Sequence, residues 1–251
     1  MINNYKKIIS LNITSGTYNS FLDNIVNLAK EKKSSYVCVA NVHMTIEAYD
    51  DSDFCEIVNK ADIVTPDGMP LAKAFKILYG VKQDRVAGMD LLPDLLEISE
   101  RIGLSVYFYG GTDLMLDKTK NFINNKYPNL KMAGLFSPPF RILNEIEKKE
   151  VSEKINSSEP NIVFVVLGCP KQERWMAENK GIINACMIGV GGALPVLIGE
   201  QKRAPKWMQS LSLEWLYRFF QEPKRLFRRY FYTNTKFLYL LFKNKFFVRN
   251  R

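Results

Sequence analysis

The stretch ADIVTPDGMPLAKAF, residues 61–75, has the pattern of a short strand followed at once by a helix. An apolar run stops at Pro66, Asp67 and Gly68, and apolar residues then recur at helical spacing. Proline and glycine serve the turn itself, and Asp67 is a good helix N-cap because its side chain accepts a hydrogen bond from a free backbone N–H. The stretch therefore predicts a strand–turn–helix unit whose carboxylate a cap alone would explain.

Similar units recur along the first 200 residues. The apolar, β-branched runs are IISLNI (8–13), YVCVANV (36–42), DIVTP (62–66), SVYFYG (105–110), IVFVVLG (162–168) and ACMIGVG (185–191). Stretches with helical periodicity separate several of them, such as NSFLDNIVNLAKEKK. The alternation predicts an α/β fold with a mostly parallel sheet covered by helices.

Several of these strands end in glycine or Asx turns that open a helix. In an open α/β sheet the carboxyl ends of the strands form one edge, where ligands bind, so we expect the turns to share one rim. Helix N-termini with closely approaching glycine backbone favour anions, phosphates above all. Neither GxGxxG nor GxxxxGK[ST] occurs, so a dinucleotide fingerprint or an ordinary P-loop is not supported. The glycines expected to contact substrate are Gly68, Gly110, Gly111, Gly168, Gly191 and Gly192.

Composition narrows the class of protein. A chain of 251 residues with 47% hydrophobic content can bury a full core. The four cysteines stand singly, without CxxC spacing, and the chain has one histidine, which predicts a reduced interior without structural zinc. We expect no membrane span, because no window approaches the roughly 18 apolar residues that a span needs.

The positive charge lies in the last fifth of the chain. From Lys202 onward there are 13 Lys and Arg against two Asp and Glu, together with 14 of the 31 aromatic residues. We place a boundary near residue 200, between an α/β domain (1–200) and a helical appendage (201–251). A continuous helix would carry Arg218, Arg225 and Arg229 on one side, as in an element that lies in an anionic membrane interface.

Two other interpretations of the appendage remain. Its helices could pack on the domain with the arginines in water, and basic residues interleaved with aromatic ones also occur in nucleic-acid-binding proteins. The segments FLYLLF and KFFV are more apolar than a phosphate-tracking groove requires, so we expect a membrane surface and no nucleic acid.

Three further features have both a structural and a functional interpretation. Asp51-Ser52-Asp53 is a DxD sequence, but it lies between two helical stretches, which favours a turn or N-cap over a metal site. His43 follows a strand end and is either a structural histidine or a base at the rim. Arg85 is either a surface charge or a diphosphate clamp.

Taken together, the strand-end turns and the tail resemble a known family. The segments are ANVHM, TPDGMPLA, RVAGMDLL, YFYGG, LGCPKQERW, IGVGGALPVLIGEQKRAPKWMQ and LEWLYRFFQEPKRLFRRY. In this order, from about residue 35 to residue 231, they resemble the WecG/TagA/CpsF family of bacterial glycosyltransferases, glycosyltransferase family 26.

The resemblance implies an inverting transfer of a sugar, N-acetylmannosamine in the best-known members, from its UDP derivative. The implied acceptor is a saccharide on a polyprenyl diphosphate at the cytoplasmic membrane face, in the synthesis of teichoic acid or another cell-wall or exocellular polysaccharide. The implied fold is a Rossmann-like domain of the GT-E type, working without a metal or other cofactor. The appendage would help the enzyme dock on the membrane and complete its active site.

The resemblance also implies roles for particular residues. The family's catalytic aspartate corresponds to Asp67, and its active-site arginine corresponds to Arg85. Its further polar positions correspond to Asn41, Lys171, Gln172, Glu173, Arg218, Arg225 and Arg228.

Three positions depart from the best-known members. Val39 stands in place of a catalytic threonine, Pro195 in place of an aspartate, and His43 in place of a frequent glutamate. These changes leave the reaction class intact but leave the sugar open. His43 could assist or replace Asp67 as the base, and a pH–rate break near 6.5, the ordinary histidine pKa, would favour it.

The sequence leaves two other classes of function open. One is a nucleic-acid-binding or RNA-modifying α/β protein, and the other is a non-catalytic membrane-associated subunit of a polysaccharide assembly machine. The oligomeric state does not follow from the sequence.

Overall fold

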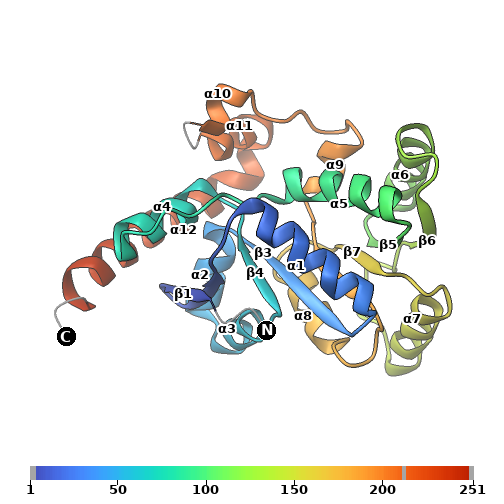
Figure 1. The fold of residues 1–251 in the computed structure, drawn as a ribbon. Coiled ribbons are helices and arrows are strands. Elements are labelled where there is room, and N and C mark those ends of the chain that lie inside the picture. Colours follow the sequence, from blue (N-terminus) through green and yellow to red (C-terminus); the bar gives the residue numbers. More distant parts are fainter. Residues whose placement is uncertain (1–3, 211–212, 249–251) are drawn as a thin grey trace.

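A six-stranded parallel sheet forms the centre of the molecule, in the strand order β4-β3-β8-β7-β5-β6 (Figure 1). The computed structural model describes residues 4–210 and 213–248. The strands of this sheet are β3 (Ser35–Ala40), β4 (Ile63–Pro66), β5 (Ser105–Gly110), β6 (Lys131–Phe136), β7 (Ile162–Val166) and β8 (Cys186–Gly189). The predicted α/β fold with a mostly parallel sheet is confirmed, and it is Rossmann-like.

Helices cover both faces of the sheet. They are α1 (Tyr18–Glu31), α2 (Val42–Asp50), α3 (Ser52–Asn59), α4 (Met69–Tyr79), α5 (Gly88–Ile102), α6 (Asp113–Lys126), α7 (Glu145–Ser157), α8 (Lys171–Glu178) and α9 (Ala193–Leu197). Buried side chains of α1, α5 and α6 form one apolar cluster with one face of the strands, and those of α2, α3, α4, α7 and α8 form another with the opposite face. Strand residues alternate between the two clusters, so every residue of β3 and β7 is buried, and both strands are apolar apart from Ser35 at the start of β3.

Two details differ from the sequence prediction. The run IISLNI is not a strand of the main sheet but folds into the antiparallel hairpin β1 (Tyr5–Ile8) and β2 (Leu11–Thr14). The hairpin turns at Ile9, whose φ is 59°, and docks through Val64 N, which donates to Thr14 Oγ1 at 3.1 Å. Strand β6 was not predicted, because KMAGLF contains a glycine and forms a partly exposed edge.

The appendage consists of α10 (Lys206–Ser210), α11 (Glu214–Gln221), α12 (Pro223–Lys243) and a short π-helical end, η1 (Asn244–Val248). The expected helices are present, and a new helix begins at the proline, as Pro223 opens α12 after a break at Glu222, whose φ and ψ are −135° and 59°. Arg218 therefore does not share one continuous helix with Arg225 and Arg229. Helix α12 packs along α2, and η1 at its end contacts α4 (Figure 1). Its buried residues Phe237, Leu240 and Leu241 belong to the core cluster that contains α2. Burying each such side chain contributes about 1.5–3 kcal/mol, so α12 is held by packing on the domain.

No helix in the described part of the chain combines the length and the apolar character that crossing a bilayer requires.

Candidate active site

The carboxyl ends of five strands bring the predicted site residues to one edge. Ala40 of β3 pairs with Pro66 of β4, so Asn41 and Asp67 leave the sheet side by side. Strand β8 lies on the other side of β3, followed by β7 and β5, so the glycine turns after these strands continue the same edge. The topology thus places the predicted turns on one rim.

Asp67 does not cap the helix that follows it. The N-cap of α4 is Gly68, which has no side chain to offer, and the described structure shows no side-chain cap there. The Asp67 carboxylate instead accepts a hydrogen bond from the backbone N–H of Gly88, the first residue of α5, at 3.1 Å. Its other oxygen lies 3.5 Å from Asn41 Nδ2, a long contact. The cap explanation of Asp67 is therefore wrong, and the acid faces the rim.

Asn41 is oriented by its own helix. It is the N-cap of α2, where its Oδ1 accepts from Met44 N at 3.1 Å. Since the amide oxygen is used in this way, the amide NH₂ group faces Asp67. The capping of α2 thus orients Asn41 so that its amide N–H groups point toward Asp67, the candidate base.

Burial raises the pKa of Asp67 to about 6. The hydrogen bond from Gly88 acts in the opposite direction, the negative charge of Glu214 adds to the rise, and Arg85 and Arg218 lower the pKa. An acid with this pKa is ionised at neutral pH, yet it is a stronger base than an ordinary aspartate, as general-base catalysis requires.

His43 has the opposite shift. Its side chain is 17% exposed in α2, and its Nδ1 lies 3.6 Å from Glu47 Oε1 without a hydrogen-bond partner in the described structure. Burial, followed by the charge of Arg229, lowers its pKa to about 4. A rate break near pH 6 would therefore report Asp67, and the expectation that such a break favours His43 is wrong for this environment.

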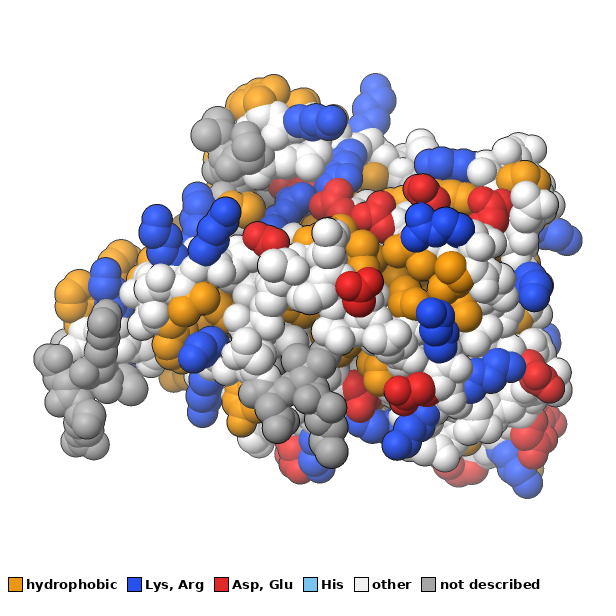
Figure 2. Space-filling view, in the orientation of Figure 1, with side chains coloured by type: hydrophobic (Ala, Val, Ile, Leu, Met, Phe, Trp, Pro, Cys, Tyr) orange, Lys and Arg blue, Asp and Glu red, His pale blue; other side chains and the backbone are white. Residues whose placement is uncertain are grey.

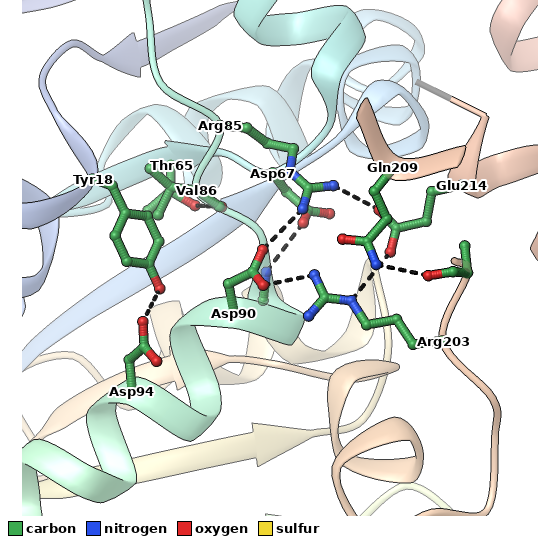
Figure 3. A network of polar contacts seen from close by, with 12 residues as sticks. Tyr18, Thr65, Asp67, Arg85, Val86, Asp90, Asp94, Arg203, Gln209 and Glu214 are labelled. Atoms are coloured by element: carbon green, nitrogen blue, oxygen red, sulfur yellow. Dashed lines mark hydrogen bonds and ion pairs between the residues drawn. The ribbon is translucent and has the colours of Figure 1, made fainter. Parts of the chain in front are cut away.

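Arg85 belongs to a ring of four charges that links the domain to the appendage (Figure 3). Its Nη2 donates to Asp90 Oδ2 at 2.9 Å and its Nη1 donates to Glu214 Oε2 at 2.7 Å. Arg203 completes the ring through ion pairs with Asp90, 2.6 Å between Nη2 and Oδ1, and with Glu214, 3.8 Å between Nε and Oε1. We name these four residues the charge ring. The sequence prediction found Arg85 but missed the other three.

The tail arginines do not act as one row. Arg218 of α11 reaches the rim, where a Cβ built on Gly192 would lie 2.7 Å from its Nη2. Arg228 is exposed on α12, beyond the break between the helices. The side chain of Arg225 lies outside the described part of the structure. Arg229, which the prediction did not assign to the site, lies close enough to His43 to lower its pKa.

The predicted polar cluster after β7 divides into an exposed and a buried part. Lys171 is exposed, whereas Gln172 and Glu173 are buried, and Gln172 Nε2 donates to Glu173 Oε1 at 2.7 Å. Burial raises the pKa of Glu173. The Gln172 amide lies against the end of β8, where a Cβ on Gly189 would come within 2.8 Å of its Nε2. Gln172 therefore lies beneath the rim at the end of β8, and its hydrogen bond to Glu173 holds its amide in place.

The rim glycines have different reasons to be glycine. Gly110 has a φ of +107°, and a Cβ there would lie 2.5 Å from Val166 O, so the sheet itself requires it. Gly111 and Gly168 have φ values of +78° and +77°, and the space beside Gly168 is open. Gly68 has an ordinary φ of −89°, which does not require glycine.

The other charged candidate has a structural role. Asp51 is the N-cap of α3, accepting from Phe54 N at 2.9 Å, and its Oδ2 accepts from Arg174 Nη2 at 2.6 Å. This confirms the cap interpretation for Asp51. Among the described residues no group of three His, Cys, Asp or Glu side chains is arranged to hold a metal ion, and the absence of a cofactor stays a prediction.

A carboxylate with a raised pKa beside arginines, at the carboxyl edge of a parallel sheet, is typical of the active site of an α/β enzyme. The comparison with known families identifies which one. A sequence profile of the Glycosyl transferase WecG/TagA/CpsF family matches residues 6–251, and the chain belongs to this family. The resemblance of the strand-end turns and the tail is thereby confirmed, and the protein is a glycosyltransferase.

Three similar proteins carry the same name. The N-acetylglucosaminyldiphosphoundecaprenol N-acetyl-beta-D-mannosaminyltransferase of Bacillus spizizenii (strain W23) is 28% identical over 222 residues, 88% of this chain and 84% of the relative. Its counterpart in Bacillus subtilis (strain 168) is 28% identical over 82% of this chain and 79% of the relative. That of Staphylococcus aureus (strain MW2) is 27% identical over 88% and 86%, respectively.

Proposed function

We propose that this protein transfers a sugar from a UDP-sugar to a saccharide carried on a polyprenyl diphosphate, with inversion, in the synthesis of a cell-wall or exocellular polysaccharide. The observation that carries the proposal is Asp67, a carboxylate with a pKa of about 6 that faces the rim beside Arg85 and Arg218. The names of the relatives supply the class of acceptor.

The geometry supports a single displacement. An acceptor hydroxyl attacks the anomeric carbon while UDP leaves from the opposite face, so a base is needed near the hydroxyl and positive charge near the diphosphate. Asp67 supplies the base, and Asn41 and Gly88 N fix its orientation. Arg218, beside Gly192 at the end of β8, supplies charge on the donor side.

The transferred sugar is N-acetylmannosamine or a related hexose or hexosamine. Val39, where the best-known members have threonine, is buried, with its Cγ1 3.5 Å from where a Cβ on Gly88 would be. A methyl group thus replaces a hydroxyl beside the backbone donor that holds Asp67. Because a site that lacks a hydrogen-bonding group discriminates less between sugars at the matching hydroxyl, Val39 leaves the choice open among sugars of this class.

The enzyme acts as a peripheral protein at the cytoplasmic face of the membrane, docking through the appendage. Exposed aromatic residues lie along α11 and α12, among them Phe220, Phe227, Phe231, Tyr239 and Phe242. Figure 2 shows Lys and Arg side chains together with hydrophobic ones over the end of the molecule formed by α4 and α12. Anionic lipid would bind both kinds of side chain.

The test is a panel of UDP-sugars offered with defined polyprenyl-diphosphate saccharides, followed by mass and linkage analysis of the product. One UDP-sugar should give a product lengthened by one sugar with inverted anomeric configuration. Absence of product from every donor, together with absence of UDP binding, would reject the proposal in favour of a non-catalytic subunit. RNA binding that vesicles do not displace would favour the nucleic-acid alternative.

A further inference from the structure

The charge ring joins the appendage to the rim through shielded ion pairs. Arg85 and Glu214 are 15% and 18% exposed, so their pairing is protected from solvent (Figure 3). Two positive and two negative charges alternate around the ring, which leaves it without net charge. Breaking such a shielded set by removing one partner leaves an uncompensated charge and is costly, whereas an exposed surface pair contributes little.

Glu214 and Arg218 lie one turn apart on α11 and therefore project from the same face of the helix. Glu214 contacts the charge ring, and Arg218 lies against Gly192. A change in the register of α11 by one residue would turn both side chains by about 100° and move Arg218 away from the end of β8. The position of Arg218 thus depends on where Glu214 is held.

We propose that Glu214 is a positioning residue for the transfer reaction, which docks α11 on Arg85 and Arg203 and thereby holds Arg218 at Gly192. The inference rests on the proposed function, and it adds residues that sequence patterns left without a role. Arg203 is the second anchor, and Asp90 keeps both arginines in place.

The same arrangement links α11 to the base. Helix α11 presents one negative and one positive charge to Asp67, since Glu214 raises the pKa of that carboxyl and Arg218 lowers it. The groups that face Asp67 are the Asn41 amide from α2, Gly88 N from α5, Arg85 from the preceding loop, and Glu214 and Arg218 from α11. Removing the charge of Glu214 leaves the arginines dominant, so the pKa of Asp67 falls.

The experiment compares Glu214→Gln with the matched control Glu200→Gln. Glu200 also lies near the start of the appendage, but its carboxylate pairs with Lys118 and is not part of the charge ring. Calorimetry measures the Kd for UDP, and kcat/KM is followed against pH. Glu214→Gln should weaken UDP binding about tenfold, which corresponds to the loss of one charge-assisted contact from Arg218. It should also move the rate break below pH 6, because the pKa of Asp67 falls. Glu200→Gln should match the wild type in both, and Glu214→Asp, which keeps the charge, should restore the break.

A second variant keeps the test valid if Glu214→Gln folds poorly. Gly192→Ala adds a Cβ that would meet Arg218 Nη2 at 2.7 Å, at an ordinary φ of −71°, and does not touch the charge ring. It should weaken UDP binding in the same way while Arg85 and Glu214 remain paired. Unchanged UDP binding in Gly192→Ala, or an unchanged Kd and rate break in a folded Glu214→Gln, would overturn the positioning role. Wild-type protein that binds no UDP would instead reject the proposed function.

Discussion

Asp67 is held between the starts of two helices, and this determines its chemistry. Its oxygens face Gly88 N of α5 and the Asn41 amide of α2, whose own oxygen is occupied by capping. The sequence was sufficient to place Asn41 and Asp67 on one rim, because both follow predicted strands, but the structure was needed to show that these two strands are neighbours. The sequence was not sufficient to orient the carboxylate, because Asp and Gly are both acceptable N-caps, and the backbone placed Gly68 at that position.

Replacing Asp67 by asparagine should lower turnover strongly without unfolding the protein. Loss of a general base lowers kcat by about 10²–10⁴-fold. A carboxyl whose pKa is raised on folding destabilises the folded state increasingly as the pH rises from about 4 to about 6, and fully above that. The Asp67→Asn variant lacks this effect, so urea denaturation at pH 7.5 should show a gain on the order of 1 kcal/mol that shrinks toward pH 4.

Asp62→Asn is the control for this substitution. Asp62 precedes β4 and so lies at the opposite edge of the sheet, where it accepts from Tyr36 N at 2.9 Å. This variant should keep its turnover. Near-normal turnover of Asp67→Asn with intact UDP binding would show that another group is the base.

The pH–rate profile separates Asp67 from His43. Activity should rise with pH through a break near 6, because Asp67 must lose its proton, and stay level above it. His43, with a pKa of about 4, is neutral throughout this range. The break should therefore persist in His43→Gln, measured as kcat/KM between about pH 4.5 and 8. A break that disappears in His43→Gln would assign the base to His43.

At the scale of elements, the predictable parts are those whose pattern is strong. Five of the six central strands are apolar runs buried on both faces, and these were identified from sequence. Strand β6 carries Gly134 and lies at the edge, and β1 and β2 share one apolar run, so periodicity gave no signal for either arrangement. The charge ring could not be predicted from the sequence for a different reason. It joins residues up to 129 positions apart, and which charges meet depends on where α11 docks.

The junction of β5 and β7 gives a prediction about stability. Gly110→Ala should destabilise the protein by about 2 kcal/mol or more, because its φ of +107° is strained for alanine and its Cβ would collide with Val166 O. Gly168→Ala, with a similar φ of +77° but open space, should cost only about 1 kcal/mol. Chemical denaturation of the two variants measures the difference. Equal losses would mean that the sheet shifts to accept the extra methyl group.

At the scale of the molecule, the appendage has two sides with different tasks. One side packs Phe237, Leu240 and Leu241 into the core, and α11 places the charge ring and Arg218 at the rim. The other side leaves its aromatic residues exposed. The sequence shows that the tail is both basic and apolar. Only the packing shows that contacts to the candidate active site and exposed aromatic surface belong to the same segment.

The exposed side of α12 should therefore bind membranes without taking part in the chemistry. Phe227 and Phe231 are 61% and 69% exposed and stack one turn apart, 6.2 Å between ring centroids. Replacing both by serine should lower binding to anionic vesicles about tenfold or more in sedimentation assays, because the variant can no longer bury the two aromatic rings in the membrane interface. Phe140→Ser, at a residue 91% exposed between β6 and α7, is the control and should bind as the wild type does. Turnover should fall for an acceptor in vesicles but not for a short-chain soluble acceptor; equal vesicle binding by all three proteins would exclude α12 as the docking surface.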